Sequence, residues 1–251
     1  MTVAIPDALS KAIREARHIC VLTGAGVSAE SGVPTFRDAM EGLWEKHDPR
    51  QLATPEGFAD DPGLVWGWYQ WRRELVAGVD PNPGHAALAE LETLANRMTL
   101  VTQNVDGLHQ RAGSSRVIEF HGNLFVDRCF GDGSVVETPV ESSAEDVPPA
   151  CPRCGSPVRP GVVWFGEAIP ESALVNAFEA ARDCDLYLSV GTSSEIYPAA
   201  GLFDIARSAG ATTVEVNPDV TEQTAYFDFV LTGKSGEVLP ELIGAAWERD
   251  L

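Results

Sequence analysis

The sequence predicts an α/β protein with a doubly wound, mainly parallel sheet and a smaller second domain formed by two insertions. Three observations support this: short β-branched runs that end in glycine or a small polar residue, helical patterns between them, and two segments that break the alternation. Continuous apolar runs of this length are typical of parallel strands buried on both faces. With 251 residues and 44% hydrophobic side chains, the chain is long enough to bury a core in one large or two unequal domains.

Six apolar runs are the predicted strands of the large domain. They lie within residues 18–26, 98–107, 117–123, 185–193, 212–219 and 227–236. Helical patterns separate several of them, as in residues 171–183 and 197–210. In an open sheet of parallel strands, ligands bind in the crevice outside the carboxyl ends of the strands. We therefore expect a functional site among the polar residues that end these runs.

Two segments form the predicted small domain. Residues 34–97 are helix-like and rich in tryptophan, and residues 122–163 hold three of the five cysteines and show little apolar periodicity. The remaining segments, residues 1–33, 98–121 and 164–251, are the predicted discontinuous sheet domain. Because both insertions leave the same sheet domain, we expect them to pack together and to form a cleft with it.

The clearest helix of the first insertion is predicted from residue 62 to residue 77. Asp61 is suited to cap its N-terminus, Pro62 to occupy its first position and Gly78 to end it. Two neighbouring stripes of the helix are Leu64, Trp68, Trp71 and Leu75, and Val65, Tyr69, Arg72 and Val76. Arg72 thus lies among apolar neighbours, where a partly buried guanidinium needs an anion. On the pattern alone, that anion is one of the 37 acidic residues of the chain.

The charge of the chain disfavours two classes of partner. Lys and Arg number 18 against 37 for Asp and Glu, which gives a net charge of −19 at pH 7. Such a surface repels phosphate backbones and anionic lipid headgroups, so neither nucleic acid nor a membrane is expected as a partner. The sequence has no run of 18 apolar residues, and its N-terminal stretch has no basic region. Both observations predict a cytoplasmic protein.

A glycine-rich turn follows the first predicted strand. Gly24, Ala25, Gly26 and Ala29 match the pattern G-x-G-x-x-G/A, which allows the backbone to approach a pyrophosphate at a helix N-terminus. Alone, this pattern is equally compatible with an ordinary strand-to-helix turn. No strand ends in an acidic residue about 20 positions on, as ribose recognition in dehydrogenases requires. We therefore expect a loop that binds a dinucleotide without serving hydride transfer.

Six motifs occur together in a characteristic order. They are GAGVSAESGVPTFRD at 24–38, TQNVDGLH at 102–109, FHG at 120–122, VWFGE at 163–167, GTS at 191–193 and VN at 216–217. With these motifs the chain resembles the sirtuins, NAD-dependent protein-lysine deacylases, over roughly residues 10–245. The resemblance implies a Rossmann-like NAD-binding domain with a small zinc-bearing domain made from two insertions.

The resemblance also implies a chemistry and the residues that perform it. His121 would be the general base and Asn104 a second catalytic residue, while the acyl group passes from lysine to the ADP-ribose part of NAD and nicotinamide is released. The NAD-binding residues implied are Gly24, Ala25, Gly26, Ala29, Phe36, Arg37, Gln103, Asn104, Asp106, Gly191, Thr192, Ser193, Asn217, Pro218, Asp219 and Ser235. From the residues alone, Asn104 and Asp106 also fit an Asx turn that opens the next helix, and His121 fits a hydrogen-bonded, half-buried histidine.

One subgroup of the family removes acidic acyl groups, and the chain resembles it at three positions. In that subgroup a Tyr and an Arg three residues apart bind the succinyl or malonyl carboxylate, and a small Ala widens the pocket. Tyr69, Arg72 and Ala53 stand at the matching places. The residues expected to pair with the backbone of an acyl-lysine protein substrate, as an added strand, are Val163, Trp164, Phe165 and Gly166.

The predicted metal site departs from the family pattern. Sirtuins carry two C-x-x-C pairs; Cys151 and Cys154 supply one, but the other position has Cys129 followed three residues later by Asp132. In a chain without a signal peptide, such cysteines indicate metal or redox chemistry before a structural disulfide. A tetrahedral zinc site of three cysteines and Asp132 is chemically allowed. Water as the fourth ligand, or no metal at all, are the alternatives.

Two other functions use the same motifs. One is mono-ADP-ribosyl transfer, which cleaves NAD in the same way but uses a different acceptor. The other is an inactive sensor of NAD or ADP-ribose. The presence of His121, Asn104 and Asp106 together favours an enzyme over a sensor, because binding alone does not require a general base.

Overall fold

The large unit of the protein is built on one parallel sheet. The structure, a computed structural model, describes residues 4–34, 48–137 and 147–247. The strands of this sheet are β1 (Ile19–Thr23), β2 (Met98–Thr102), β3 (Val117–Glu119), β6 (Leu186–Val190), β7 (Thr212–Asn217) and β8 (Phe229–Thr232). They pair in parallel in the order β3-β2-β1-β6-β7-β8, which confirms the predicted sheet. The strand order reverses between β1 and β6, and a ligand crevice is expected at that point.

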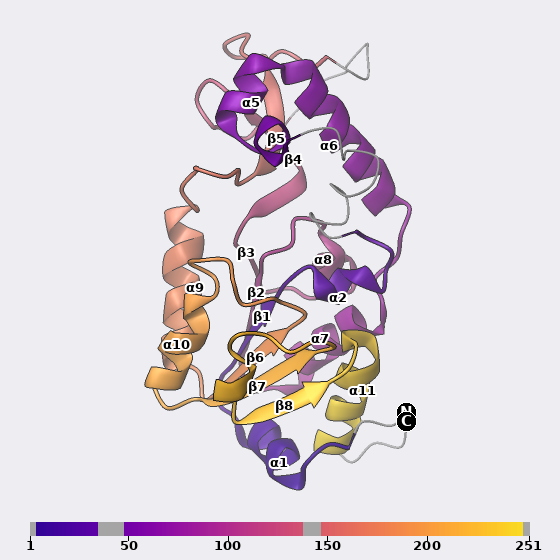
Figure 1. Cartoon of the computed structure of the whole chain (residues 1–251), viewed down its shortest axis with the longest axis vertical. Helices are drawn as coiled ribbons and strands as arrows, with labels where there is room; N and C mark the ends of the chain where they lie inside the picture. The colour runs from indigo at the N-terminus through magenta and orange to yellow at the C-terminus, as the bar shows by residue number, and fades with distance from the viewer. Residues whose placement is uncertain (1–3, 35–47, 138–146, 248–251) are drawn as a thin grey trace.

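Helices cover both faces of this sheet (Figure 1). One face carries α1 (Asp7–Glu15), α2 (Gly26–Ala29), α7 (Pro83–Leu94) and α11 (Ser235–Ala246), and the other carries α9 (Glu171–Asp183) and α10 (Gly201–Ser208). Within β1, Ile19 and Val21 enter the first core, whereas Cys20 and Leu22 enter the second. Because side chains alternate between the faces of a strand, a strand covered on both sides is apolar throughout.

The small unit lies at the other end of the molecule and has its own core (Figure 1). It contains α4 (Pro49–Leu52), α5 (Pro55–Asp60), α6 (Pro62–Ala77) and the antiparallel pair β4 (Gly122–Cys129) and β5 (Val158–Val162). The Asp61 side chain accepts a hydrogen bond from the backbone N–H of Leu64 at 3.0 Å, Pro62 is the first residue of α6 and Gly78 follows its end. The sequence prediction for this helix is thus confirmed.

One helix of the first insertion packs with the large unit. The buried residues of α7, Ala87, Leu88 and Leu91, lie in the core between the sheet and α11. The chain therefore returns to the large unit before residue 98, and the limits drawn for the two domains stay a prediction. Two short elements complete the described chain: α8 (Leu108–Arg111) and the 3₁₀-helix η1 (Thr224–Tyr226). Among the described residues, the helices are too short or too polar to span a membrane.

Candidate active site

The loops that follow β1 and β6 touch one another where the strand order reverses. The N–H of Gly26 donates to the carbonyl of Gly191 at 2.8 Å. A Cβ on Gly24 would lie 2.8 Å from the Gly191 oxygen, and one on Gly191 would lie 2.5 Å from the backbone nitrogen of Val27. Gly191 also has a φ of 57°, which favours glycine. The close contact between the two loops thus requires glycine at these positions, whether or not a ligand also approaches them.

Asn104 and Asp106, which follow β2, form a partly buried network with the glycine-rich turn. The Asn104 amide donates to the Gly24 carbonyl at 3.1 Å and to Ser28 Oγ at 3.0 Å, and Ser28 Oγ donates to Asp106 at 2.8 Å. Asp106 also accepts from the N–H of Leu108 at 2.9 Å, so the Asx turn at the start of α8 is present as well. Both N–H groups of the Asn104 amide are used, and its oxygen is the atom left to accept a ribose hydroxyl.

His85 extends this network, and the sequence analysis did not select it. The imidazole is fully buried, and its Nε2 lies 3.3 Å from Ser28 Oγ. Because the Ser28 proton is donated to Asp106, His85 Nε2 carries a proton of its own, and its Nδ1 accepts from the N–H of Asn82. Burial lowers the pKa of His85, so the ring is neutral. The available sequence signal was the cap of α7, where Asn82 and His85 form a capping box.

His109 lies next to His85, with 4.8 Å between the ring centroids. Its Nε2 is 2.9 Å from Thr23 Oγ1, which donates to Thr102 Oγ1 at 2.9 Å, so the imidazole donates to Thr23. Burial and the neighbouring His85 lower the pKa of His109 to about 3. The ring is thus neutral, and its hydrogen bond to Thr23 helps to hold together the ends of β1 and β2.

His121 lies in the two-residue link between β3 and β4 and has the geometry of a base. Its Nδ1 lies 3.0 Å from the backbone carbonyl of Gln103. A carbonyl only accepts hydrogen bonds, so Nδ1 carries the proton and Nε2 keeps its lone pair. Burial lowers the pKa of His121, and the bond to Gln103 opposes this shift in part. The neutral imidazole is therefore the dominant form at pH 7 and is able to accept a proton.

The remaining predicted NAD-binding residues lie around the same edge of the sheet. Gln103 donates to Thr192 Oγ1 at 3.0 Å, and Asn217 donates to the Thr192 carbonyl at 3.2 Å, which links the ends of β2, β6 and β7. Ser235 is buried at the start of α11, where its hydroxyl donates to Glu30 at 3.1 Å. The exposed members of the predicted set are Ala25, Ala29, Ser193, Pro218 and Asp219. Phe36 and Arg37 lie outside the described residues.

The predicted acyl-binding residues gather in the core of the small unit. Tyr69 and Ala53 are buried there, with 3% and 5% of their surface exposed. The guanidinium carbon of Arg72 lies 5.0 Å from the ring centroid of Trp68 and 5.8 Å from that of Tyr69. Within the described ranges, no carboxylate reaches ion-pair distance of Arg72. Burial lowers the pKa of Arg72, while Tyr69 and the Asp106 carboxylate oppose that effect.

The segment predicted to bind the substrate backbone, Val163 to Gly166, connects Ala53, one of these residues, to His121. The N–H of Val163 donates to the carbonyl of His121 at 2.8 Å, and the N–H of Phe165 donates to that of Ala53 at 2.9 Å. The N–H of Trp164 has an internal acceptor too, the carboxylate of Glu167 at 2.8 Å. A substrate strand along this segment thus has to pair with groups other than these three N–H donors.

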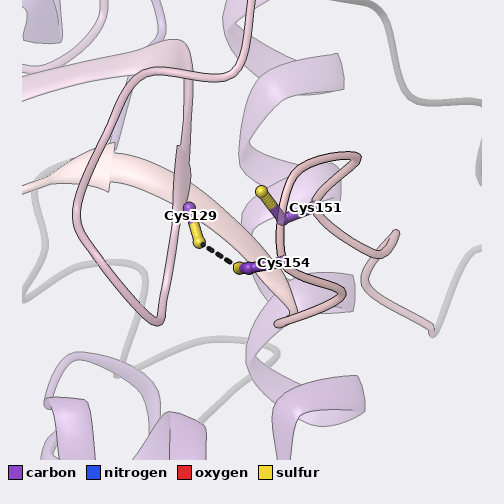
Figure 2. A group of neighbouring side chains, drawn as sticks. All are labelled: Cys129, Cys151 and Cys154. Carbon is purple, nitrogen blue, oxygen red and sulfur yellow. Dashed lines mark hydrogen bonds between the residues drawn. The ribbon is translucent and has the colours of Figure 1, made fainter.

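Three cysteines gather where β4 ends (Figure 2). The sulfur atoms of Cys129, Cys151 and Cys154 all lie within 4.8 Å of one another, and those of Cys129 and Cys154 are 3.4 Å apart. Asp132 is not part of this group: its carboxylate accepts from Ser134 at 2.6 Å and pairs with Arg153 at 2.7 Å. Three thiols at this spacing fit a tetrahedral zinc ion with one further ligand. The structure brings the three predicted cysteines together, and Asp132 lies beside Cys129, so its place as the fourth zinc ligand stays a prediction.

Comparison with known proteins decides the family. The sequence profile of the Sir2 family matches residues 24–198. The chain belongs to the Sir2 family, the sirtuins. NAD-dependent protein deacylase 1 of Pseudomonas aeruginosa is 53% identical over 238 residues, which cover 92% of this chain and 95% of that protein. NAD-dependent protein deacylase of Methylococcus capsulatus is 51% identical over 245 residues, or 95% and 96% of the two chains.

Solved sirtuin structures have the same fold. A Sir2 homologue in complex with NAD superposes with a TM-score of 0.91 at 44% identity and covers 98% of this chain and 96% of that one. A mutant Sir2 homologue in complex with ADP-ribose gives 0.90 at 45% identity, with 97% of both chains covered. The chain is thus an NAD-dependent sirtuin enzyme, a protein deacylase. Its glycine-lined turn and the polar residues that end the strands fit a dinucleotide.

Proposed function

We propose that this sirtuin removes acidic acyl groups, succinyl and malonyl, from lysine side chains of proteins, and acetyl groups as well. The observation that supports this most is the environment of Arg72. Its guanidinium lies against two aromatic rings, one of them that of Tyr69, and no carboxylate of the described chain lies within ion-pair distance of it, since Asp106 acts only from farther away. A partly buried cation needs an anion, and the fork of a guanidinium matches a carboxylate. The carboxylate of a succinyl or malonyl group supplies that anion.

The chemistry follows from the residues at the carboxyl ends of β2 and β3. NAD, when bound, supplies the ribose carbon to which the acyl oxygen becomes attached as nicotinamide leaves. His121 accepts a ribose hydroxyl proton at Nε2, because its Nδ1 proton is held by the Gln103 carbonyl. The Asn104 amide oxygen orients a ribose hydroxyl, since both of its N–H groups are fixed on Gly24 and Ser28. Asp106 keeps Ser28 and Asn104 in place.

A protein substrate is supported by the segment after β5. One sirtuin related in structure, at 34% identity and a TM-score of 0.76, is bound to a myristoylated histone peptide, and another, at 31% and 0.79, to an acetylated peptide. In this chain Val163 is bonded to His121 and Phe165 to Ala53, so the segment reaches both the general base and the acyl pocket. A peptide that lies along it would place its acyl-lysine between the two.

A structural zinc ion fits the small unit. Cys129, Cys151 and Cys154 would hold it, and thiolates are the ligands that structural zinc prefers. Backbone N–H groups of Arg153 and Cys154 lower the pKa of Cys151 to about 7, whereas burial raises the pKa of Cys129 to about 11. None of the five cysteines of the chain forms a disulfide, which supports the prediction of a cytoplasmic, reducing location. The acidic surface supports the prediction that neither nucleic acid nor a membrane is a partner.

Substitution of Arg72 tests the acyl preference. In Arg72→Met the kcat/KM for a succinyl-lysine peptide should fall by about ten- to hundredfold more than that for the acetyl-lysine peptide, because a hydrogen bond between charged groups is lost. Nicotinamide release and peptide mass report both reactions and distinguish deacylation from ADP-ribosyl transfer to the peptide. Arg73→Met is the matched control, since Arg73 has its own carboxylate, Asp127, at 2.7 Å. Equal losses on the two peptides in Arg72→Met would refute the proposal.

A further inference from the structure

A buried ion pair beside the acyl pocket takes no part in the chemistry described above. Arg159 has 7% of its surface exposed, and its guanidinium reaches the two oxygens of Glu167 at 2.5 and 2.9 Å. It also donates to the carbonyls of Pro160 and Val162. Glu167 is less deeply buried, with 25% of its side chain exposed, but withdrawing the charge of Arg159 from water is still costly, and a well-packed apolar pair is often as stable. The arrangement therefore suggests a role in positioning a neighbour.

That neighbour is Trp164. The guanidinium carbon of Arg159 lies 3.3 Å from the centroid of the Trp164 ring, and the Glu167 carboxylate accepts from the Trp164 N–H at 2.8 Å. The ion pair thus holds the tryptophan at its ring and at its backbone. Trp164 is 2% exposed and also packs against Phe58, with 5.3 Å between ring centroids. The indole has little freedom to turn.

The indole in turn fixes the hydroxyl of Tyr69. Trp164 Nε1 lies 2.9 Å from the Tyr69 oxygen. An indole N–H only donates, so the tyrosine oxygen is the acceptor and its own proton points away from Trp164. The adjacent Arg72 also donates a hydrogen bond to the tyrosine oxygen, and in the part of the chain that the structure describes the tyrosine proton itself has no acceptor. A hydroxyl donor and a guanidinium are therefore both available to one anion.

We propose that Trp164, held by Arg159 and Glu167, is a positioning residue that directs the Tyr69 proton toward the acyl carboxylate and so selects acidic acyl groups over acetyl. This inference rests on the proposed function, because it assigns the carboxylate to the same pocket. Acetyl-lysine presents a methyl group at that place and gains nothing from the aligned proton. The effect of Trp164 on selectivity must accordingly pass through the Tyr69 hydroxyl.

A double-mutant cycle tests this dependence. The variants are Trp164→Phe, Tyr69→Phe and the double variant, each assayed for kcat and KM with succinyl-lysine and acetyl-lysine peptides. Trp164→Phe should lower the ratio of the two kcat/KM values about tenfold, mainly through the KM for the succinyl peptide. In the Tyr69→Phe background the same substitution should leave the ratio unchanged. Glu167→Gln, which weakens the ion pair, should give a smaller loss of the same kind.

Trp66→Phe is the control for the loss of indole volume. Trp66 lies on the same helix as Tyr69 and is 3% exposed, but its Nε1 has no partner among the described residues. Trp66→Phe should change kcat/KM by the same factor for the succinyl-lysine and acetyl-lysine peptides. The inference is overturned if Trp164→Phe also changes the two kcat/KM values by the same factor. It is overturned as well if Trp164→Phe still lowers their ratio in the Tyr69→Phe background. Failure of the proposed function is distinct from either result, because it would show as an unselective loss in Arg72→Met.

Discussion

On the large-unit side of the site, Ser28, Asn104 and Asp106 bind one another, whereas on the small-unit side Arg72 meets no carboxylate of the described chain. The first set is complete before any substrate arrives, so it presents fixed donors and acceptors to a ribose. The second set contains a cation that a ligand has to neutralise. The comparison suggests a division of roles: the large unit performs a chemistry common to all acyl groups, and the small unit decides which acyl group is preferred.

Replacement of His121 is the strongest way to break this comparison. His121→Ala should reduce kcat by about 10²- to 10⁴-fold, the usual contribution of a general base, and by the same factor for succinyl and acetyl peptides. Calorimetry should show that NAD still binds, because Gly24, Gly26 and Asn104 are untouched. If the loss depended on the acyl group, the two units would not have separate roles.

The main helices and strands, and the polar residues that end the strands, could be predicted from the sequence. The reason is local: continuous apolar runs mark doubly covered strands, and Asp61, Pro62 and Gly78 mark the limits of α6 by their own backbone preferences. The sequence was not sufficient for α7, whose packing on α11 depends on contacts between residues about 150 positions apart along the chain.

The candidate site shows the same distinction. The motifs identified His121, Asn104 and Asp106. They did not give the tautomer of His121, because the proton on Nδ1 is inferred only from the contact of Nδ1 with the Gln103 carbonyl. His85 and the Arg159 ion pair were missed because their partners come from other elements. Asp132 was expected with the cysteines from its spacing alone. In the folded chain its carboxylate binds Ser134 and Arg153 and also reaches Cys129, so its role as a zinc ligand stays a prediction.

Acidic pH should weaken the large-unit network through His109. Its pKa is about 3 in the folded chain and about 6.5 when unfolded, so below pH 6.5 the unfolded chain binds a proton that the folded chain does not. The free energy of unfolding therefore falls as pH drops below 6.5, by about 1.4 kcal/mol at pH 5.5 from this residue, and is unaffected above it. Urea denaturation at pH 7.5 and 5.5 measures this loss.

The matched variant for this effect is His109→Gln, which keeps a donor for Thr23. Between pH 7.5 and 5.5 the free energy of unfolding of this variant should fall by about 1.4 kcal/mol less than that of the wild type, because glutamine does not titrate. An identical loss in both proteins would mean that His109 does not titrate differently in the two states. At pH 7.5, His109→Gln should have the same ratio of kcat/KM for the succinyl-lysine and acetyl-lysine peptides as the wild type, because the large-unit network serves the chemistry common to both.

The smallest effect is expected at Asp132, on the small-unit side. Its pair with Arg153 is half exposed, at 49% and 58% of the two side chains, and ion pairs in contact with water contribute little to stability. Asp132→Asn should therefore leave both the zinc content of the purified protein and its thermal unfolding close to the wild type. Cys151→Ser, which removes one of three clustered thiols, should lower the zinc content well below one ion per chain. Loss of zinc in Asp132→Asn as large as in Cys151→Ser would instead make the Asp132 carboxylate the fourth ligand of the zinc ion.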